Sequence, residues 1–202
     1  MAKILGICGS PRGKSGTEYA LKAALEEARK YGVTTELITL CAKKLNFCIN
    51  CDKCIKEENQ KCSIHDDDMT PIYEKFYNAD GYLIASPVYE MSVTGQLSVF
   101  FDRFRPCWNI LKDRGDYFYN KVGGAIAVGG ARNGGQETTI GRIHNFYHNL
   151  GIIVINLGAP GYAGASLWSH SGSYKQLAED EQGLENARRI GKRVATTVLK
   201  LK

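Results

Sequence analysis

Short apolar segments alternate with amphipathic segments along the chain. Residues 3–8 (KILGIC) and 82–86 (YLIAS) are almost entirely apolar, as expected for strands buried on both faces of a parallel sheet. Residues 33–40 (VTTELITL) are rich in β-branched residues and predict a further strand. Residues 121–128 (KVGGAIAV) and 152–157 (IIVINL) complete a set of five predicted strands.

The segments between these strands predict helices. Their apolar positions recur at the spacing of one helix face, and the expected helices cover residues 17–31, 70–78, 93–104, 136–150 and 179–199. Thr70 is expected to cap the second helix, with Pro71 as its first residue. The carboxylates of Asp66–Asp68 are expected to place negative charge near the N-terminus of this helix. The pattern predicts an α/β fold with a doubly wound, five-stranded parallel sheet. One domain is expected over residues 1–202, with an insertion at about 41–65 after the second strand.

Composition narrows the class of protein. Apolar residues make up 44% and charged residues 23% of the chain, which is typical of a globular protein in water. The net charge of +5 comes from interleaved bases and acids, so no nucleic-acid surface is expected. No apolar run approaches the ~20 residues that cross a bilayer, so no membrane partner is expected. The first residues lack the pattern of a secretory signal, and we expect a cytoplasmic location.

Four of the seven cysteines lie close together in the expected insertion. Cys48, Cys51, Cys54 and Cys62 have the spacing C-x2-C-x2-C-x7-C. Three cysteines at successive x2 spacing favour a [4Fe–4S] cluster, with the fourth thiolate supplied from a nearby loop. Zinc sites more often use two separated C-x2-C pairs, and zinc or unligated thiols remain the alternatives. The other three cysteines are expected to be ordinary: Cys8, Cys41 and Cys107.

A glycine-rich loop follows the first predicted strand and opens the first helix. In that position backbone N–H groups and the helix dipole face an anion. We assign Ser10, Arg12, Ser15, Gly16 and Thr17 to a site for a terminal phosphate, with hydroxyl donors and one positive charge. The alternatives are a nucleoside-triphosphate loop or a turn without a ligand. A triphosphate loop needs four residues between its two glycines, and here there are three.

Two further loops are expected beside this one. Ligands of an open α/β sheet bind beyond the carboxyl ends of the strands. Residues 86–96 follow the third predicted strand, and the glycine-rich residues 129–137 follow the fourth. Glycines let the backbone approach a flat ring closely. Tyr89 is placed to pack against such a ring.

The order of these motifs resembles a known family. Gly9-Ser-Pro-Arg12, Ser86-Pro-Val-Tyr89 and Thr94-Gly-Gln-Leu97 with Phe101-Asp-Arg103 are similar to the flavodoxin-like FMN reductase superfamily. Together with the cysteines and Gly134-Gly-Gln-Glu137, the chain resembles the iron–sulfur flavoproteins of anaerobic microbes over about residues 3–199.

The resemblance implies a flavodoxin-like fold, FMN and a [4Fe–4S] cluster as cofactors. It assigns two loops to the flavin ring, through the following residues: Pro87, Val88, Tyr89, Met91, Gly130, Ala131 and Gly135. The family often has an aromatic residue or Gly after the Tyr, where this chain has Glu90. The phosphate loop and the lack of a second nucleotide motif favour FMN over FAD.

The resemblance also implies a function. An oxidoreductase of this type passes electrons between a one-electron carrier such as ferredoxin, the cluster and FMN, and can reduce oxygen or peroxide. It further implies a homo-oligomer, a dimer or tetramer, with weak support from the aromatic residues 117–119 and the loop 158–174. The alternatives are an NAD(P)H-dependent FMN or quinone reductase with structural zinc, and a non-catalytic redox sensor.

Overall fold

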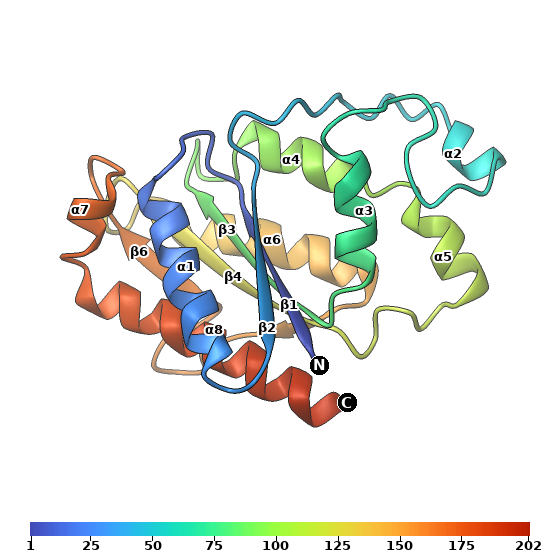
Figure 1. Ribbon diagram of the computed structural model, residues 1–202. Coiled ribbons are helices and arrows are strands. Elements are labelled where there is room, and N and C mark those ends of the chain that lie inside the picture. The colour runs from blue at the N-terminus through green and yellow to red at the C-terminus, as the bar shows by residue number, and fades with distance from the viewer.

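A computed structural model describes residues 1–202 and shows one sheet between two layers of helices (Figure 1). The strands are β1 (Lys3–Cys8), β2 (Thr34–Thr39), β3 (Gly81–Pro87), β4 (Val122–Gly129), β5 (Ile153–Ile155) and β6 (Ala165–Trp168). The helices are α1 (Gly16–Arg29), α2 (Lys53–Lys56), α3 (Thr70–Tyr77), α4 (Gly95–Asp102), α5 (Cys107–Asp113), α6 (Gln136–Leu150), α7 (Tyr174–Leu177) and α8 (Glu181–Leu201).

The sheet has the strand order β2-β1-β3-β4-β5, and every pair of neighbours is parallel. This order is the flavodoxin-like form of the doubly wound fold, so the fold expected from the sequence is confirmed. Because the strands are parallel, all their carboxyl ends meet at one edge, which is the upper edge in Figure 1. Both chain termini lie at the opposite edge (Figure 1).

The fifth position of the sheet is filled by two strands in succession. Residues 153–155 of β5 pair with the start of β4, and residues 165–168 of β6 pair with its end. The sequence predicted one strand over 152–157 and missed β6. Ala and Ser are weak strand formers, so the order of β6 comes from its pairing with β4 and from packing rather than from its own sequence.

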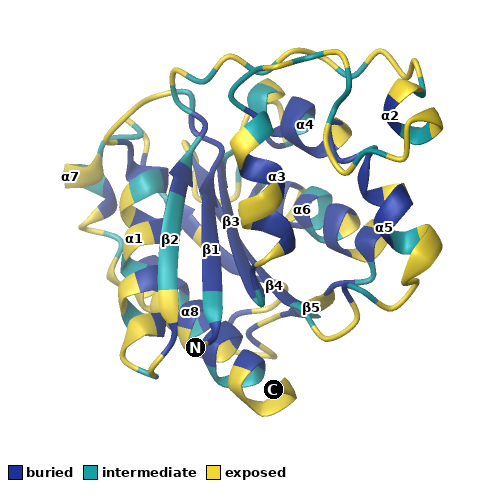
Figure 2. Ribbon diagram, turned by 45° about the vertical axis from the view of Figure 1, so that its right-hand side comes forward, coloured by how far each residue is buried: buried dark blue, intermediate teal, exposed yellow.

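The two faces of the sheet are covered by different helices. The helices α1 and α8 pack on one face, and α3, α4, α5 and α6 pack on the other (Figure 2). In β1 the side chains alternate between the two cores: Ile4 and Cys8 face the first, and Leu5 and Ile7 face the second. The central strands are therefore buried on both sides, as their apolar sequences predicted.

Several helix boundaries differ from the prediction. The helix expected over 93–104 ends at Asp102, and after Pro106 a separate helix, α5, follows. Thr70 does not cap α3 but is its first residue, and the Asp67 carboxylate accepts a hydrogen bond from the Met69 N–H just before it. The short helices α2 and α7 were not predicted, because four residues are too few to show a helical period.

The longest helix, α8, packs closely against α1. Its N-terminus is capped by the Asp180 carboxylate, which accepts a hydrogen bond from the Gly183 N–H at 3.0 Å. At Gly191 the backbones approach so closely that an added Cβ would collide with the carbonyl oxygen of Ala24. The helix α8 carries many charged residues. No helix of the protein combines the length and the apolar character that a membrane span requires.

The close approach at Gly191 predicts a large effect of one methyl group. We expect Gly191→Ala to lower the free energy of unfolding by about 1–3 kcal/mol, because α1 and α8 must move apart. The matched control is Gly141→Ala in α6, where an added Cβ meets nothing within 4 Å. That change should raise stability by up to ~1 kcal/mol through helix propensity. Chemical denaturation of both variants checks the difference, and equal effects would contradict the packing described for Gly191.

Candidate functional site

The loop of residues 9–17 joins β1 to α1 at the carboxyl edge of the sheet. Its start is held by two hydrogen bonds: the Gly9 N–H donates to the Ala85 carbonyl at 2.7 Å, and the Thr94 hydroxyl donates to the Gly9 carbonyl at 2.7 Å. An added Cβ at Gly9 would lie 2.8 Å from a Leu97 side-chain carbon, so a side chain has no room here. The start of the loop is thereby fixed against β3 and α4.

Several backbone donors in this loop have no partner within the protein. The N–H groups of Ser10, Gly13, Ser15 and Thr17 take part in none of the protein's hydrogen bonds. They surround the N-terminus of α1, where the helix dipole adds partial positive charge. Free N–H groups at a helix N-terminus are the usual arrangement of an anion site.

The three hydroxyls that the sequence assigned to this loop have different surroundings. The Ser15 hydroxyl caps α1 by accepting from the Glu18 N–H at 3.2 Å, and the Ser10 hydroxyl bonds with the backbone of Arg12. The Thr17 hydroxyl makes no hydrogen bond within the protein, although the residue is only 3% exposed. Thr17 is therefore the side chain with a free hydroxyl in the loop.

The segment that follows β6 touches the phosphate loop, and sequence analysis missed it. The Arg12 guanidinium donates to the Gly172 carbonyl at 3.4 Å, and the Gly16 N–H donates to the same oxygen at 3.1 Å. The Ser169 N–H donates to the Gly129 carbonyl at 2.9 Å and so joins this segment to the loop after β4. The charge of Arg12 and the N–H of Gly16 are thus engaged by protein carbonyls.

The second loop begins where β3 ends. Pro87 is the last residue of the strand, and the Val88 N–H donates to the Val128 carbonyl at 2.9 Å. The half-buried Val88 side chain packs against the core. These two residues therefore continue the sheet and position the turn that follows.

The turn after Val88 has an unusual backbone. Tyr89 and Ser92 exchange two hydrogen bonds of 2.9 Å, and between them Glu90 and Met91 have φ angles of +47° and +59°. Left-handed conformations cost free energy for residues other than Gly, and they gather at functional sites. The turn presents the exposed side chains of Tyr89 and Met91 at the carboxyl edge of the sheet.

The third loop, after β4, is organised by Gln136. Its side-chain oxygen accepts from the Gly134 N–H at 2.8 Å, and its nitrogen donates to the carbonyls of Ala131 at 2.6 Å and Leu167 at 3.3 Å. Gln136 is nearly fully buried, whereas Gly130 is exposed. The Gly-Gly-Gln-Glu motif was the signal for this role, but a sequence does not reveal which backbone groups the amide contacts.

The second and third loops meet at Gly135. Its φ is +96°, and an added Cβ would lie 2.9 Å from the Met91 Cα, so only glycine fits. The Thr138 hydroxyl donates to the Met91 carbonyl at 2.6 Å across the same junction. A cavity of about 400 Å³ lies here, which is within the range of small-ligand pockets. Its lining is Met91, Arg132, Asn133, Gly135, Gln136, Glu137, Thr138 and Ser166.

The cysteine-containing insertion lies beside α4 and α5 and is tied to them (Figure 1). Arg103 forms a buried ion pair with Asp67, with its Nη1 2.6 Å from the Asp67 Oδ2. The Asn109 side chain donates to the carbonyls of Cys54 at 3.0 Å and Asn59 at 2.7 Å. The insertion is therefore anchored from both α4 and α5.

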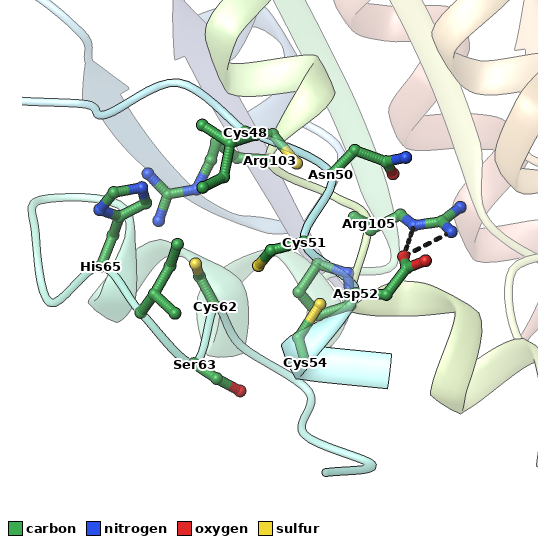
Figure 3. Close-up of a pocket in the computed structure, with 13 residues that line it drawn as sticks. Cys48, Asn50, Cys51, Asp52, Cys54, Cys62, Ser63, His65, Arg103 and Arg105 are labelled. Carbon is green, nitrogen blue, oxygen red and sulfur yellow. Dashed lines mark hydrogen bonds and ion pairs between the residues drawn. The ribbon is translucent and has the colours of Figure 1, made fainter. Parts of the chain in front are cut away.

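All four motif cysteines line one cavity. Figure 3 shows them among the residues of this cavity, which include His65, Arg103 and Arg105. Asn50 and Asp52, on either side of Cys51, have φ angles of +51° and +54°, so the chain turns sharply between the cysteines. These turns bring together the thiols that the sequence spacing had grouped: Cys48, Cys51, Cys54 and Cys62.

The Cys54 thiol has a raised pKa. Burial is the largest cause, and the neighbouring thiols of Cys62, Cys48 and Cys51 raise this pKa further. Arg105 lines the same cavity, with its charge paired to Asp52 at 2.7 Å. No group of three His, Cys, Asp or Glu side chains has the geometry of a site for a single metal ion.

The remaining cysteines lie apart from this cavity, and all seven are free thiols. Burial raises the pKa of Cys8 to about 11 and that of Cys107 to about 12. Cys41 is half-buried, with its sulfur 3.7 Å from the position of an added Cβ at Gly13. These positions agree with small apolar side chains rather than reactive groups.

Comparison with known proteins identifies the family. Residues 2–164 match the family described as NADPH-dependent FMN reductase. An iron–sulfur flavoprotein of Methanocaldococcus jannaschii is 43% identical over 202 residues, which cover 99% of both chains. An iron–sulfur flavoprotein of Archaeoglobus fulgidus is 39% identical over 199 residues, which cover 98% of both chains.

A solved structure supports the fold independently. The flavodoxin-type, WrbA-like protein of Agrobacterium tumefaciens matches with a TM-score of 0.69 and 20% identity, and the match covers 100% of both chains. The geometry of the loops, the family match and the near full-length relatives agree with one another. The chain therefore belongs to the iron–sulfur flavoproteins of the NADPH-dependent FMN reductase family and is an FMN-dependent oxidoreductase.

Proposed function

We propose that this oxidoreductase passes electrons between a one-electron carrier such as ferredoxin, a [4Fe–4S] cluster and FMN. The observation that carries the proposal is the convergence of Cys48, Cys51, Cys54 and Cys62 on one cavity whose lining includes no residue of the three loops. A cluster exchanges single electrons and FMN exchanges one or two, so the pair would link one-electron carriers to two-electron acceptors.

The phosphate loop fits FMN through its backbone. The free N–H groups of Ser10, Gly13, Ser15 and Thr17 and the free Thr17 hydroxyl are available to a terminal phosphate. The Ser15 hydroxyl serves α1 as its cap, so its contribution to the phosphate is the N–H group. Arg12 adds positive charge at the mouth of the loop while its guanidinium bonds to protein carbonyls.

The other two loops fit a flat ring. The turn at Tyr89 and Met91 and the glycine loop at Gly130, Ala131 and Gly135 share a junction held by Thr138. Met91 of the turn lies against Gly135 of the glycine loop, while the side chains of Tyr89 and Met91 and the Gly130 backbone are exposed. We propose that the isoalloxazine lies beside this contact and against both loops, with backbone N–H groups of the glycine loop bonding to its carbonyls.

The donor set of the insertion fits an iron–sulfur cluster. Four thiols line the cavity, and thiolates are the ligands of [4Fe–4S] clusters. Two arginines, Arg103 and Arg105, line the same cavity as N–H donors, with their charges paired to Asp67 and Asp52. The four cysteines would hold the cluster, and Arg103 and Asn109, from the region of α4 and α5, would hold the insertion in place.

The proposed partner is ferredoxin or a similar one-electron carrier, as the resemblance to iron–sulfur flavoproteins implies. Charge does not select it: residues 41–65 have five lysines against three carboxylates, but Asp66, Asp67 and Asp68 follow directly and Lys43 is paired with Asp68. Free thiols at all seven cysteines agree with a reducing compartment, and we propose a cytoplasmic location. Oxygen or peroxide is the proposed acceptor.

Thr17 provides a test of the phosphate site. We expect Thr17→Val to weaken FMN binding by about 1–3 kcal/mol, because it removes a hydroxyl bonded to a charged phosphate and keeps the shape of the side chain. Titration of cofactor-free protein with FMN measures the affinity. Ser15→Ala should lower the free energy of unfolding instead, by about 0.5–2 kcal/mol, through loss of the helix cap. Unchanged FMN affinity in Thr17→Val would exclude this hydroxyl from the phosphate site.

The cysteine motif is tested by Cys51→Ala. We expect the anaerobically purified variant to lose iron and sulfide and the broad brown absorbance, and to keep FMN, because the cluster cavity and the flavin loops share no residue. Dithionite should still reduce its flavin, whereas reduction by ferredoxin should become much slower. Iron, sulfide and flavin assays with stopped-flow spectra provide the measurements.

Cys41→Ala is the matched control for this experiment. Cys41 lies in the same insertion but does not line the cavity, so the variant should keep its iron. Equal rates of reduction by ferredoxin in Cys51→Ala and the wild type would show that the cluster is not the entry point. Zinc in place of iron in the wild type would favour the alternative of an NAD(P)H-dependent reductase with a structural metal.

We also propose a homo-oligomer, a dimer or tetramer. The side chains of Phe47, just before the motif, and Ile49, inside it, are 72% and 67% exposed. In the aromatic cluster 117–119, Phe118 is buried and Tyr119 is 57% exposed. Neighbouring exposed apolar side chains mark interaction surfaces, so we propose that Phe47 and Ile49 contact a second copy of the chain.

Sedimentation velocity tests this assembly. We expect a species of at least twice the 22.3 kDa chain mass. Phe47→Asp should shift the equilibrium toward the monomer, because it places a charge in the proposed apolar contact without changing the lining of the cysteine cavity. The control, Lys56→Asp on the exposed face of α2, should leave the assembly unchanged. A monomer in the wild type with both cofactors bound would contradict the proposal.

A further inference from the structure

Arg103 has an unusual environment for an arginine. It is 1% exposed, and its terminal nitrogens are bonded: Nη1 donates to Asp67 at 2.6 Å and to the Asn46 carbonyl at 2.8 Å, and Nη2 uses one of its two hydrogens to donate to Asp67 at 3.2 Å. The Nε atom is buried and has no hydrogen-bond partner. A buried N–H without an acceptor costs free energy, and such groups are rare in native proteins.

The free Nε belongs to a side chain that lines the cysteine cavity. Arg103 and the four motif cysteines line the same cavity, and Figure 3 shows the arginine on the side where Cys48 and Cys62 lie. A cluster held by the four cysteines would therefore share its cavity with the arginine that has the free Nε.

The surroundings hold the guanidinium in one place. The Tyr73 hydroxyl donates to the Arg103 carbonyl at 2.7 Å, and both carboxylate oxygens of Asp67 accept hydrogen bonds from the end of the Arg103 side chain. The remaining edge of the planar group carries the Nε–H and the second hydrogen of Nη2. His65 also lines this cavity, and its buried Nε2 has no hydrogen-bond partner. Two buried nitrogens of the cavity lining are therefore unpartnered, Arg103 Nε and His65 Nε2.

We propose that the Arg103 Nε–H donates a hydrogen bond to a sulfur of the iron–sulfur site, either a cysteine thiolate or a cluster sulfide, and thereby raises the cluster's reduction potential. This inference rests on the proposed [4Fe–4S] cluster. A donor to sulfur stabilises the reduced cluster, which carries one more negative charge than the oxidised cluster. Asp67 opposes this effect because it neutralises the guanidinium.

The structure makes opposite predictions for two variants. Arg103→Lys keeps a positive charge near Asp67 but loses the rigid Nε–H, and the potential of the cluster should fall. Asp67→Asn keeps the Nε–H and removes the neutralising carboxylate, and the potential should rise. We expect about a tenfold change in the ratio of reduced to oxidised cluster at a fixed solution potential for Arg103→Lys, which is ~59 mV for one electron.

Arg105→Lys is the matched control. Arg105 lines the same cavity, but its Nε already donates to Asp52 at 3.1 Å and its side chain is 36% exposed. Solvent screens such a charge, so its replacement should change the potential much less. Anaerobic redox titration of the reconstituted holoprotein, followed by the EPR signal of the reduced cluster, measures all three variants beside the wild type.

The outcomes distinguish a failure of the cluster proposal from a failure of the Arg103 hydrogen bond. Wild-type protein that holds no iron after anaerobic reconstitution overturns the cluster proposal itself. If iron is bound and Arg103→Lys titrates like the wild type, the cluster stands and the Arg103 bond is wrong. If Arg103→Lys fails to hold the cluster, pulsed EPR of the Arg105→Lys protein made with 15N-labelled arginine decides: coupling of the reduced cluster to an arginine nitrogen supports the bond, and no coupling overturns it.

Discussion

Parallel pairing of β1 with β2 on one side and β3 on the other is the constraint on which the sites depend. Parallel strands need helical crossovers, so every strand must end at the same edge and every ligand-binding loop must begin there. The Gly9 N–H bonded to the Ala85 carbonyl continues this pairing past the end of β1 into the phosphate loop. The loops can then vary in sequence while the sheet holds their starting points.

A second constraint acts on the insertion, which has little regular structure of its own. Its conformation depends on the buried pair between Arg103 and Asp67 and on the bonds from Asn109. Breaking a buried ion pair by removing one partner typically costs ~3–5 kcal/mol, because the other charge is left without compensation. Arg103 bonds to Asn46 and to Asp67, so a pair this costly to break fixes the chain on both sides of the four cysteines.

Much of the fold could be predicted from the sequence, and so could the identity of the four cysteines that line one cavity. The strands from β1 to β4 are apolar because both of their faces are buried, and this burial leaves a clear local pattern. The four cysteines are separated by so few residues that local turns alone keep them close. The strand β6 could not be predicted, since four residues carry no period and depend on β4 for their partners.

Local sequence patterns were enough to predict the doubly wound fold, the glycine-rich loop of residues 9–17 and the grouping of the four cysteines, because each is encoded in residues that are near one another along the chain. The hydrogen bonds of Gln136 and Arg103, and the lack of one at the Thr17 hydroxyl, became known from the folded structure. It also brought the segment at Ser169 onto two other loops. Such contacts join residues far apart in sequence, and they are set by the packing of strands and helices rather than by any local pattern.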